Sequence, residues 1–146
     1  MASPMATKRS TVEMERPMKF RGTGYSGSVV TMHVPGEGEA REGPGPMELV
    51  VLAAGGCTAS DVVDILRKQR ASLEAFRIEI ESERAKGPPA VLTRVHLKYV
   101  FRGDLKEDKV KRAIALSQEK YCSVSIMLKR AGVDVTTSYD IERPRP

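Results

Sequence analysis

The stretch PMELVVLAAGGCTASDVVDILRKQR, residues 46–70, is the longest apolar run of the chain and constrains its fold most strongly. It predicts a helix, because Pro46 suits the first helical position, Glu48 adds negative charge to the first turn, and basic residues gather at the other end. From Leu49 to Ala59 every residue except Thr58 is apolar or small. A helix that is apolar on all sides must be covered on all sides.

This run is interpreted as too short, and too soon followed by charge, to span a bilayer, so no membrane partner is expected. Within it, Thr58 and Ser60 are expected to hydrogen-bond back to the helix backbone. Asp61 and Asp64 are expected to line a solvated or interfacial face.

The segments on either side of this helix alternate between apolar and polar residues, as strands do. Residues 12–21 predict a first strand, 22–27 a turn, and 29–34 a second strand of a hairpin. Residues 35–46 are rich in Gly and Pro and predict a mobile loop before the helix. A second hairpin is expected from residues 76–81 and 94–101.

The last third of the chain predicts two shorter helices and a final strand. Asp104 is expected to cap the second helix, with Glu107 in the capping-box position. Ser123 is a candidate cap for a short third helix that Gly132 closes. Residues 133–141 alternate as a last strand.

This order of elements, with strands in hairpins, favours an α+β fold with antiparallel sheet. We expect residues 1–146 to form a single domain, with residues 1–11 as a disordered tail. Two hairpins leave a long apolar helix only partly covered. A second subunit could complete the cover, so we expect a homodimer.

Composition argues against several partners. The net charge is +5, but the 24 basic residues are interspersed among 19 acidic ones. This pattern predicts a solvated surface of mixed charge and not a binding site for a polyanion. With no Trp and 5% aromatic residues, the chain is poorly suited to stack on nucleic acid. The first eleven residues have no apolar targeting region, and two cysteines do not make a disulfide scaffold, so a cytoplasmic location is expected. Residues 35–46 lack the features of a phosphate-binding loop.

Cys57 and Cys122 are the only two cysteines and allow three interpretations. They can be packed core residues, since free Cys is among the most buried residue types. They can bind a metal together with His33 and His96, but the spacing differs from known zinc patterns and both histidines fall on polar strand faces. They can also be a thiol redox pair.

A redox pair requires a reactive thiolate, whereas an unperturbed Cys has a pKa near ~8.5. A guanidinium against the sulfur would lower this pKa, because Arg stays charged even when buried. Arg16 falls on the apolar face of the first predicted strand and is the candidate. Pro17 beside it can place a bulge there that rotates Arg16 outward, in which case Arg21 is the fallback.

Two motifs resemble those of the OsmC/Ohr family of organic hydroperoxide reductases. They are P-M-E-L-x(7)-C-T, which contains Cys57, and L-S-x-E-K-Y-C-S-V, residues 116–124, which contains Cys122. The resemblance spans roughly residues 12 to 141 and points to the OsmC-like branch. It implies an intertwined α+β homodimer with antiparallel sheets around two central helices that carry the cysteines.

The resemblance also implies a reaction. Cys57 would attack an organic hydroperoxide and become a sulfenic acid, Cys122 would form a disulfide with it, and an external dithiol, often a lipoyl group in this family, would reduce the disulfide. Arg16 would activate Cys57, and no metal or other cofactor would be needed. The family's glutamate position is Met47 here, and Glu48 lies one residue, about 100° of helix rotation, away.

That departure keeps a second hypothesis open. An OsmC-like protein without catalysis could bind a small apolar or lipid-like ligand in the same dimer interface.

Overall fold

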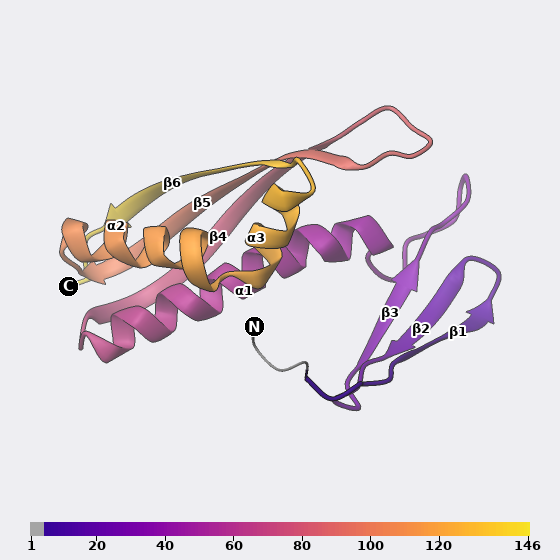
Figure 1. Cartoon of the computed structure of the whole chain (residues 1–146), viewed down its shortest axis with the longest axis horizontal. Coiled ribbons are helices and arrows are strands. Elements are labelled where there is room, and N and C mark those ends of the chain that lie inside the picture. Colours follow the sequence, from indigo (N-terminus) through magenta and orange to yellow (C-terminus); the bar gives the residue numbers. More distant parts are fainter. Residues whose placement is uncertain (1–4) are drawn as a thin grey trace. The chain divides into compact units, whose positions relative to one another are not determined.

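The computed structural model describes residues 5–146, which divide into one compact unit that ends at Val50 and another from Val51 to Pro146. The first unit is a three-stranded antiparallel sheet in the order β1-β2-β3 (Figure 1). Its strands are β1 (Thr11–Arg16), β2 (Lys19–Thr23) and β3 (Val29–His33).

The prediction of one strand over residues 12–21 is wrong, because the chain reverses between β1 and β2. Pro17 has a restricted φ, and Met18 adopts a left-handed φ of 68°, so these two residues form a tight turn. Arg16 therefore ends β1 and pairs across the turn with Lys19. Residues 5–10 have no regular structure, and residues 1–4 of the expected tail lie outside the described part.

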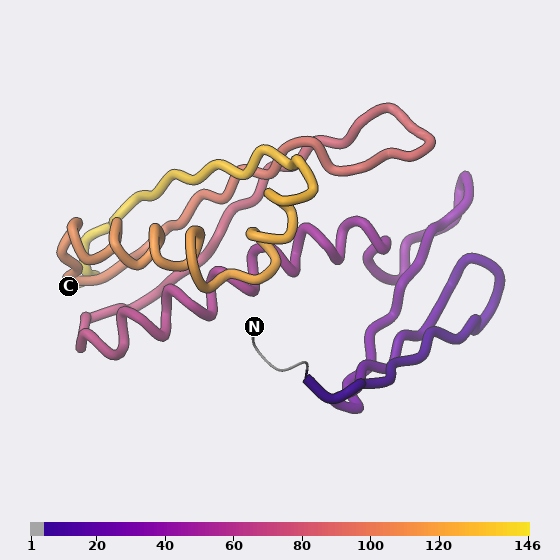
Figure 2. The backbone as a smooth tube through the Cα atoms, viewed as in Figure 1, coloured from indigo at the N-terminus to yellow at the C-terminus, as the bar shows by residue number. Residues whose placement is uncertain are grey.

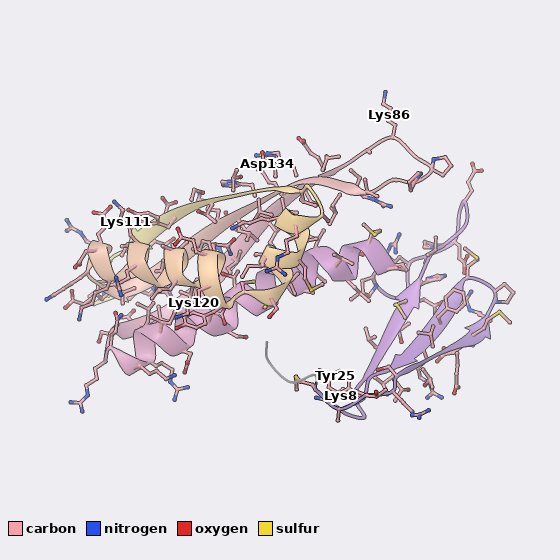
Figure 3. All side chains as sticks on the ribbon, viewed as in Figure 1. Lys8, Tyr25, Lys86, Lys111, Lys120 and Asp134 are labelled. Atoms are coloured by element: carbon pink, nitrogen blue, oxygen red, sulfur yellow. The ribbon has the colours of Figure 1, made fainter. Side chains whose placement is uncertain are left out.

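Preceding β1, Lys8 lies against the turn between β2 and β3. Its ammonium is 4.5 Å from the centre of the Tyr25 ring, and Figure 3 shows the two side chains next to each other. This is the distance of a cation–π contact.

Helix α1 (Pro46–Lys68) begins where the sequence predicts and ends two residues earlier than expected. Glu48 accepts a hydrogen bond of 3.0 Å from the backbone N–H of Gly45, which satisfies a donor at the helix start. At 23 residues, α1 is long and apolar enough to cross a membrane by length and composition alone. The prediction that it is too short is therefore wrong, although core helices of soluble proteins share this property.

The second unit contains a sheet in the order β4-β5-β6. Strands β4 (Ser72–Arg84) and β5 (Leu92–Asp104) form the predicted antiparallel hairpin, whereas β6 (Asp134–Glu142) runs parallel to β5. The predicted α+β fold is thus confirmed, while the antiparallel pairing expected for its sheets does not hold for β6. Parallel neighbours need a crossover, and Figure 2 shows the chain returning through residues 107–130 before it enters β6.

Three helical segments form this crossover: α2 (Glu107–Leu116), the π-helix η1 (Ser117–Tyr121) and α3 (Ser123–Arg130). Two predicted caps are wrong. Asp104 is the last residue of β5, and α2 is preceded by Lys106 without a side-chain cap. Cys122 caps α3, and Ser123 is the first residue of that helix.

The core of the second unit lies between its sheet and its helices. Tyr99 and Phe101 of β5 are fully buried, and the Phe76 and Phe101 rings stack with centroids 4.8 Å apart. Gly55 lets α1 approach β4 closely, because a Cβ there would lie 2.6 Å from Cδ1 of Ile80. The other fully buried apolar residues are Ala54, Val62, Leu66, Val95, Leu97, Val110, Ala113 and Cys122.

Candidate active site

Cys57 of α1 and Cys122, between η1 and α3, lie together in the second unit. Their sulfur atoms and a carboxylate oxygen of Asp61 are all within 4.8 Å of one another. Asp61 follows Cys57 by four residues, so the two side chains share one face of α1. Both thiols are free; Cys57 is half-buried and Cys122 is fully buried. The structure therefore brings together the two residues that the sequence singles out and adds a carboxylate.

The π-helix positions Cys122. The wide turn closes with a 2.7 Å hydrogen bond from the Cys122 N–H to the carbonyl of Ser117, five residues earlier. The backbone then becomes extended, so Cys122 caps α3 and its sulfur accepts from the N–H of Ser125 at 3.4 Å. Its thiol also lies 3.3 Å from the Ser125 hydroxyl oxygen.

Burial is the main influence on the Cys122 thiol and raises its pKa. The two hydrogen bonds with Ser125 act in the opposite direction, and the neighbouring Cys57 raises the pKa further. Cys122 is thus held as a thiol, which suits a residue that reacts second. Cys57 is the more accessible of the pair.

A buried set of hydroxyl groups supports the site. Thr58 Oγ1 lies 2.6 Å from the hydroxyl of Tyr99 and 2.7 Å from that of Ser117. Ser117 in turn donates to Asp61 at 2.8 Å, and Gln118 Nε2 donates to Thr58 and Tyr99. Burial raises the pKa of Tyr99 to about 12. These bonds tie α1 to β5 and to the π-helix, and they fix the Asp61 carboxylate.

Sequence reasoning missed most of this network. Thr58 does not bond back to its own helix as predicted, whereas Ser60 does, to the carbonyl of Gly56. Asp61 faces the sulfur pair and not simply a solvated surface, while Asp64 is exposed and pairs with Lys68. The available signal was the i, i+4 spacing of Cys57 and Asp61.

In the first unit, Arg16 is bonded to the loop before α1. Its guanidinium donates to Glu39 at 2.6 Å and to Glu42. This contact with Arg16, and the backbone N–H of Gly36, hold the pKa of Glu39 at about 2. The activating role of Arg16 stays a prediction, as does that of Glu48, which appears in no salt bridge between the residues that the structure describes.

Both histidines are predicted on polar strand faces. This is confirmed for the half-buried His96, which alternates with the buried Val95 and Leu97 of β5, but it is wrong for His33. His33 is fully buried, accepts from the N–H of Glu42 at 2.9 Å and contacts Glu39 at 3.1 Å. His96 bonds to the hydroxyls of Thr136 and Ser138. The metal site in which both histidines join the cysteines is therefore disfavoured.

Two clefts border α1 in the second unit. One, of about 400 Å³, includes Asp61, and its walls are contributed by Ile65, Leu116 and Tyr121. The other, of about 240 Å³, runs along Leu52 and Gly56 toward β4. The first cleft gives small molecules a route to the carboxylate beside the sulfur pair.

Comparison with known proteins supports the arrangement of helices and sheets. The family profile described as "OsmC-like protein" matches residues 36–138. Protein YhfA of Escherichia coli K12 is 40% identical over 134 residues, covering 91% of this chain and 97% of YhfA.

Among solved structures, a hypothetical protein from Aquifex aeolicus is 28% identical, with a TM-score of 0.84 over 97% of this chain and all of that one. An organic hydroperoxide resistance protein OsmC from Legionella pneumophila shares the fold with a TM-score of 0.68 at 20% identity, covering 94% of this chain and 99% of its own. The match to the family profile over most of the chain, together with the identity to YhfA, shows that this protein belongs to the OsmC-like family.

Proposed function

We propose that this protein is a thiol-dependent peroxidase that reduces organic hydroperoxides. The observation that carries the proposal is the convergence of Cys57 and Cys122 within 4.8 Å while both are free thiols. A disulfide joins sulfurs about 2.05 Å apart, so small side-chain movements suffice to link them. Membership of the OsmC-like family supports a peroxide-related role at the level of the family.

The proposed reaction has three steps. The Cys57 thiolate attacks the O–O bond of the hydroperoxide, the alkoxide leaves and is protonated to an alcohol, and Cys57 becomes a sulfenic acid. The Cys122 thiol then attacks this sulfur, so that a disulfide forms and water leaves. An external dithiol, such as a lipoyl group, reduces the disulfide and restores both thiols.

The different burial of the two thiols supports this order. Cys57 is accessible to a substrate, whereas Cys122 is enclosed and its raised pKa keeps it protonated until the sulfenic acid forms beside it. Apolar walls from Ile65 and Leu116 suit the organic part of a substrate. We propose Arg16 as the group that activates Cys57, and Glu48 as the carboxylate that assists it.

We further propose that the protein is a cytoplasmic homodimer. Leu52, in the apolar part of α1, is 53% exposed, and Val12 and Met14 of β1 are 65% and 66% exposed. Apolar side chains this exposed on regular elements favour cover by a second copy. Such a dimer would also allow Arg16 to come from either subunit.

The test is consumption of cumene hydroperoxide and of hydrogen peroxide with a dithiol reductant. We expect wild type to consume the organic peroxide faster, Cys57→Ser to be inactive, and Cys122→Ser to lose dithiol-supported turnover. Ser60→Ala is the matched control, since Ser60 is exposed and its hydroxyl donates to the backbone carbonyl of Gly56 in α1. No turnover by folded, reduced wild type would contradict the proposal.

One observation favours the alternative of a non-catalytic binding protein. The carboxylate position of the family is Met47, and Glu48 is engaged with the backbone of Gly45. Under this alternative, a lipid-like ligand would bind equally well to wild type and Cys57→Ser, and neither would consume peroxide.

A further inference from the structure

We propose that Cys57, Cys122 and Asp61 of the reduced protein bind one thiophilic divalent cation, with Zn²⁺ as the best match. The proposal rests on the geometry of the three side chains and does not depend on peroxidase activity. It differs from the zinc site considered from the sequence, because Asp61 replaces the histidines.

The distances suit a single ion. Zinc binds cysteine sulfur at about 2.3 Å and carboxylate oxygen at about 2.0–2.2 Å, so ligands around one tetrahedral ion lie about 3.3–4 Å apart. The two sulfurs and the Asp61 oxygen are already within 4.8 Å of one another.

The negative charges of the three ligands also favour a bound cation. Two thiolates and a carboxylate in one place repel one another unless a cation lies between them. No salt bridge within the described residues includes Asp61. A divalent cation would displace the protons of both thiols as it binds.

Hydrogen bonds from neighbouring residues orient two of the three ligands. Ser117 donates to Asp61 at 2.8 Å, and the N–H of Ser125 donates to the sulfur of Cys122 at 3.4 Å. Protein metal sites use such supporting bonds to orient carboxylate ligands and tune their affinity. A set of two sulfurs and one oxygen matches the borderline-soft character of Zn²⁺ better than that of Mg²⁺ or Ca²⁺.

The site is also accessible. Asp61, one of the three ligands, lines the cleft of about 400 Å³. Three protein ligands leave the fourth tetrahedral position for water. Metal binding and disulfide formation would exclude each other, because both use the same two sulfurs.

The test uses Co²⁺ as a spectroscopic probe and Zn²⁺ as the competitor, with reduced full-length protein. We expect a thiolate-to-cobalt charge-transfer absorption that saturates at one Co²⁺ per chain and disappears when Zn²⁺ is added. Asp61→Asn should weaken Co²⁺ binding by roughly tenfold or more, by analogy with lost supporting groups at metal sites. Asp64→Asn is the matched control, because Asp64 lies on the same helix, is exposed and pairs with Lys68.

A second arm needs no substitution. Wild type oxidised with diamide to the Cys57–Cys122 disulfide should bind no Co²⁺, and binding should return after reduction. Absence of the charge-transfer absorption in folded, reduced wild type would overturn the proposal, as would equal Co²⁺ affinity of Asp61→Asn and Asp64→Asn. Peroxide turnover measured separately in chelator-treated protein reports on the peroxidase proposal alone.

Discussion

At the scale of single residues, the site depends on groups that no sequence motif marks. Thr58 sits beside the nucleophile candidate in the chain, yet its hydroxyl connects to Tyr99 and Ser117 in the buried interior. Through Ser117 this network fixes Asp61 beside the sulfur pair. The same hydrogen bonds therefore serve stability and site geometry together.

Replacing Thr58 by Val should destabilise the protein. The change keeps the shape of the side chain but leaves the buried hydroxyls of Tyr99 and Ser117 with one partner fewer, which costs about 1–3 kcal/mol in the free energy of unfolding. Ser60→Ala should change it by less than about 0.5 kcal/mol. Urea denaturation of both variants measures the difference, and equal stability of the two would contradict the role of the network.

At the scale of elements, the loop between β3 and α1 is tied down by charged groups. Arg16 donates to Glu39 and Glu42, and Arg41 donates to the carbonyls of His33 and Gly43. A mobile loop was the sequence expectation, and these contacts give it a defined conformation. The buried His33 ring also fixes this loop, because it accepts a hydrogen bond from the N–H of Glu42.

Acid should loosen this loop. The bonds with Arg16 favour ionised Glu39 and lower its pKa from 4.5 to about 2. A lowered pKa in the folded state means that the stabilisation is complete above pH 4.5 and is lost as the pH falls toward about 2. Hydrogen exchange at the amide of Glu42 should report the loss.

The matched pair for this test is Glu39→Gln and Glu37→Gln. Glu39→Gln should loosen the loop at neutral pH and remove the acid dependence, whereas Glu37→Gln should behave as wild type. Glu37 lies in the same loop and takes part in no ion pair among residues 5–146. Identical exchange profiles for the two variants would rule out the Glu39 contact as the cause.

The close pairing of β4 with β5 at one end of their ladder depends on Gly103, which is paired with Leu73. Its φ of 150° is accompanied by close approach to β4, since a Cβ would lie 2.0 Å from the carbonyl oxygen of Ser72. Gly103→Ala should therefore lower the free energy of unfolding by about 2 kcal/mol or more. Gly132→Ala is the control, because Gly132 also has a positive φ but a Cβ there would meet no neighbouring atom. We expect it to lower the free energy of unfolding by about 1 kcal/mol. Thermal unfolding of both variants measures the two losses of stability. Gly103→Ala reports steric clash together with backbone strain, and Gly132→Ala reports backbone strain alone.

The secondary structure shows what sequence patterns can and cannot predict. The ends of α1 and the β4–β5 hairpin follow from apolar runs and strict alternation, which are local signals. The turn at Pro17 and Met18 was missed because the alternation of apolar residues continues across it. The parallel pairing of β6 depends on the path of residues 107–130 across the sheet, which no local pattern encodes.

The site was predictable only in part for the same reason. Cys57 and Cys122 stood out because they are rare and lie in recognisable motifs. Ser117, Tyr99 and Gln118 meet Thr58 only through the tertiary fold, and the π-helix that positions Cys122 has no simple sequence signature. Asp61 could have been found from its spacing to Cys57.

At the scale of the whole molecule, the apolar surface of α1 is the main feature that a single chain leaves uncovered. Leu52 is 53% exposed on this helix, although the helix is the most apolar segment of the chain. The proposed homodimer accounts for this exposure. The two clefts that border α1 are also consistent with a second subunit at this helix.

Leu52→Glu should therefore shift the protein toward monomers, because it would place a charge in the apolar interface. Val91→Glu is a well-matched control, since Val91 is also 53% exposed but lies in the connection between β4 and β5. Light scattering after size exclusion measures the molar mass. A wild type that is monomeric, or equal behaviour of both variants, would refute the dimer.

The central claim is that Cys57 and Cys122 react with each other after a hydroperoxide oxidises Cys57. The most direct measurement is mass spectrometry of the protein after treatment with one equivalent of cumene hydroperoxide. We predict the loss of both thiol hydrogens and a Cys57–Cys122 disulfide in the peptide map, and, in Cys122→Ser, a sulfenic acid at Cys57 that dimedone traps. Two thiols that still alkylate after the same treatment of folded protein would contradict the claim.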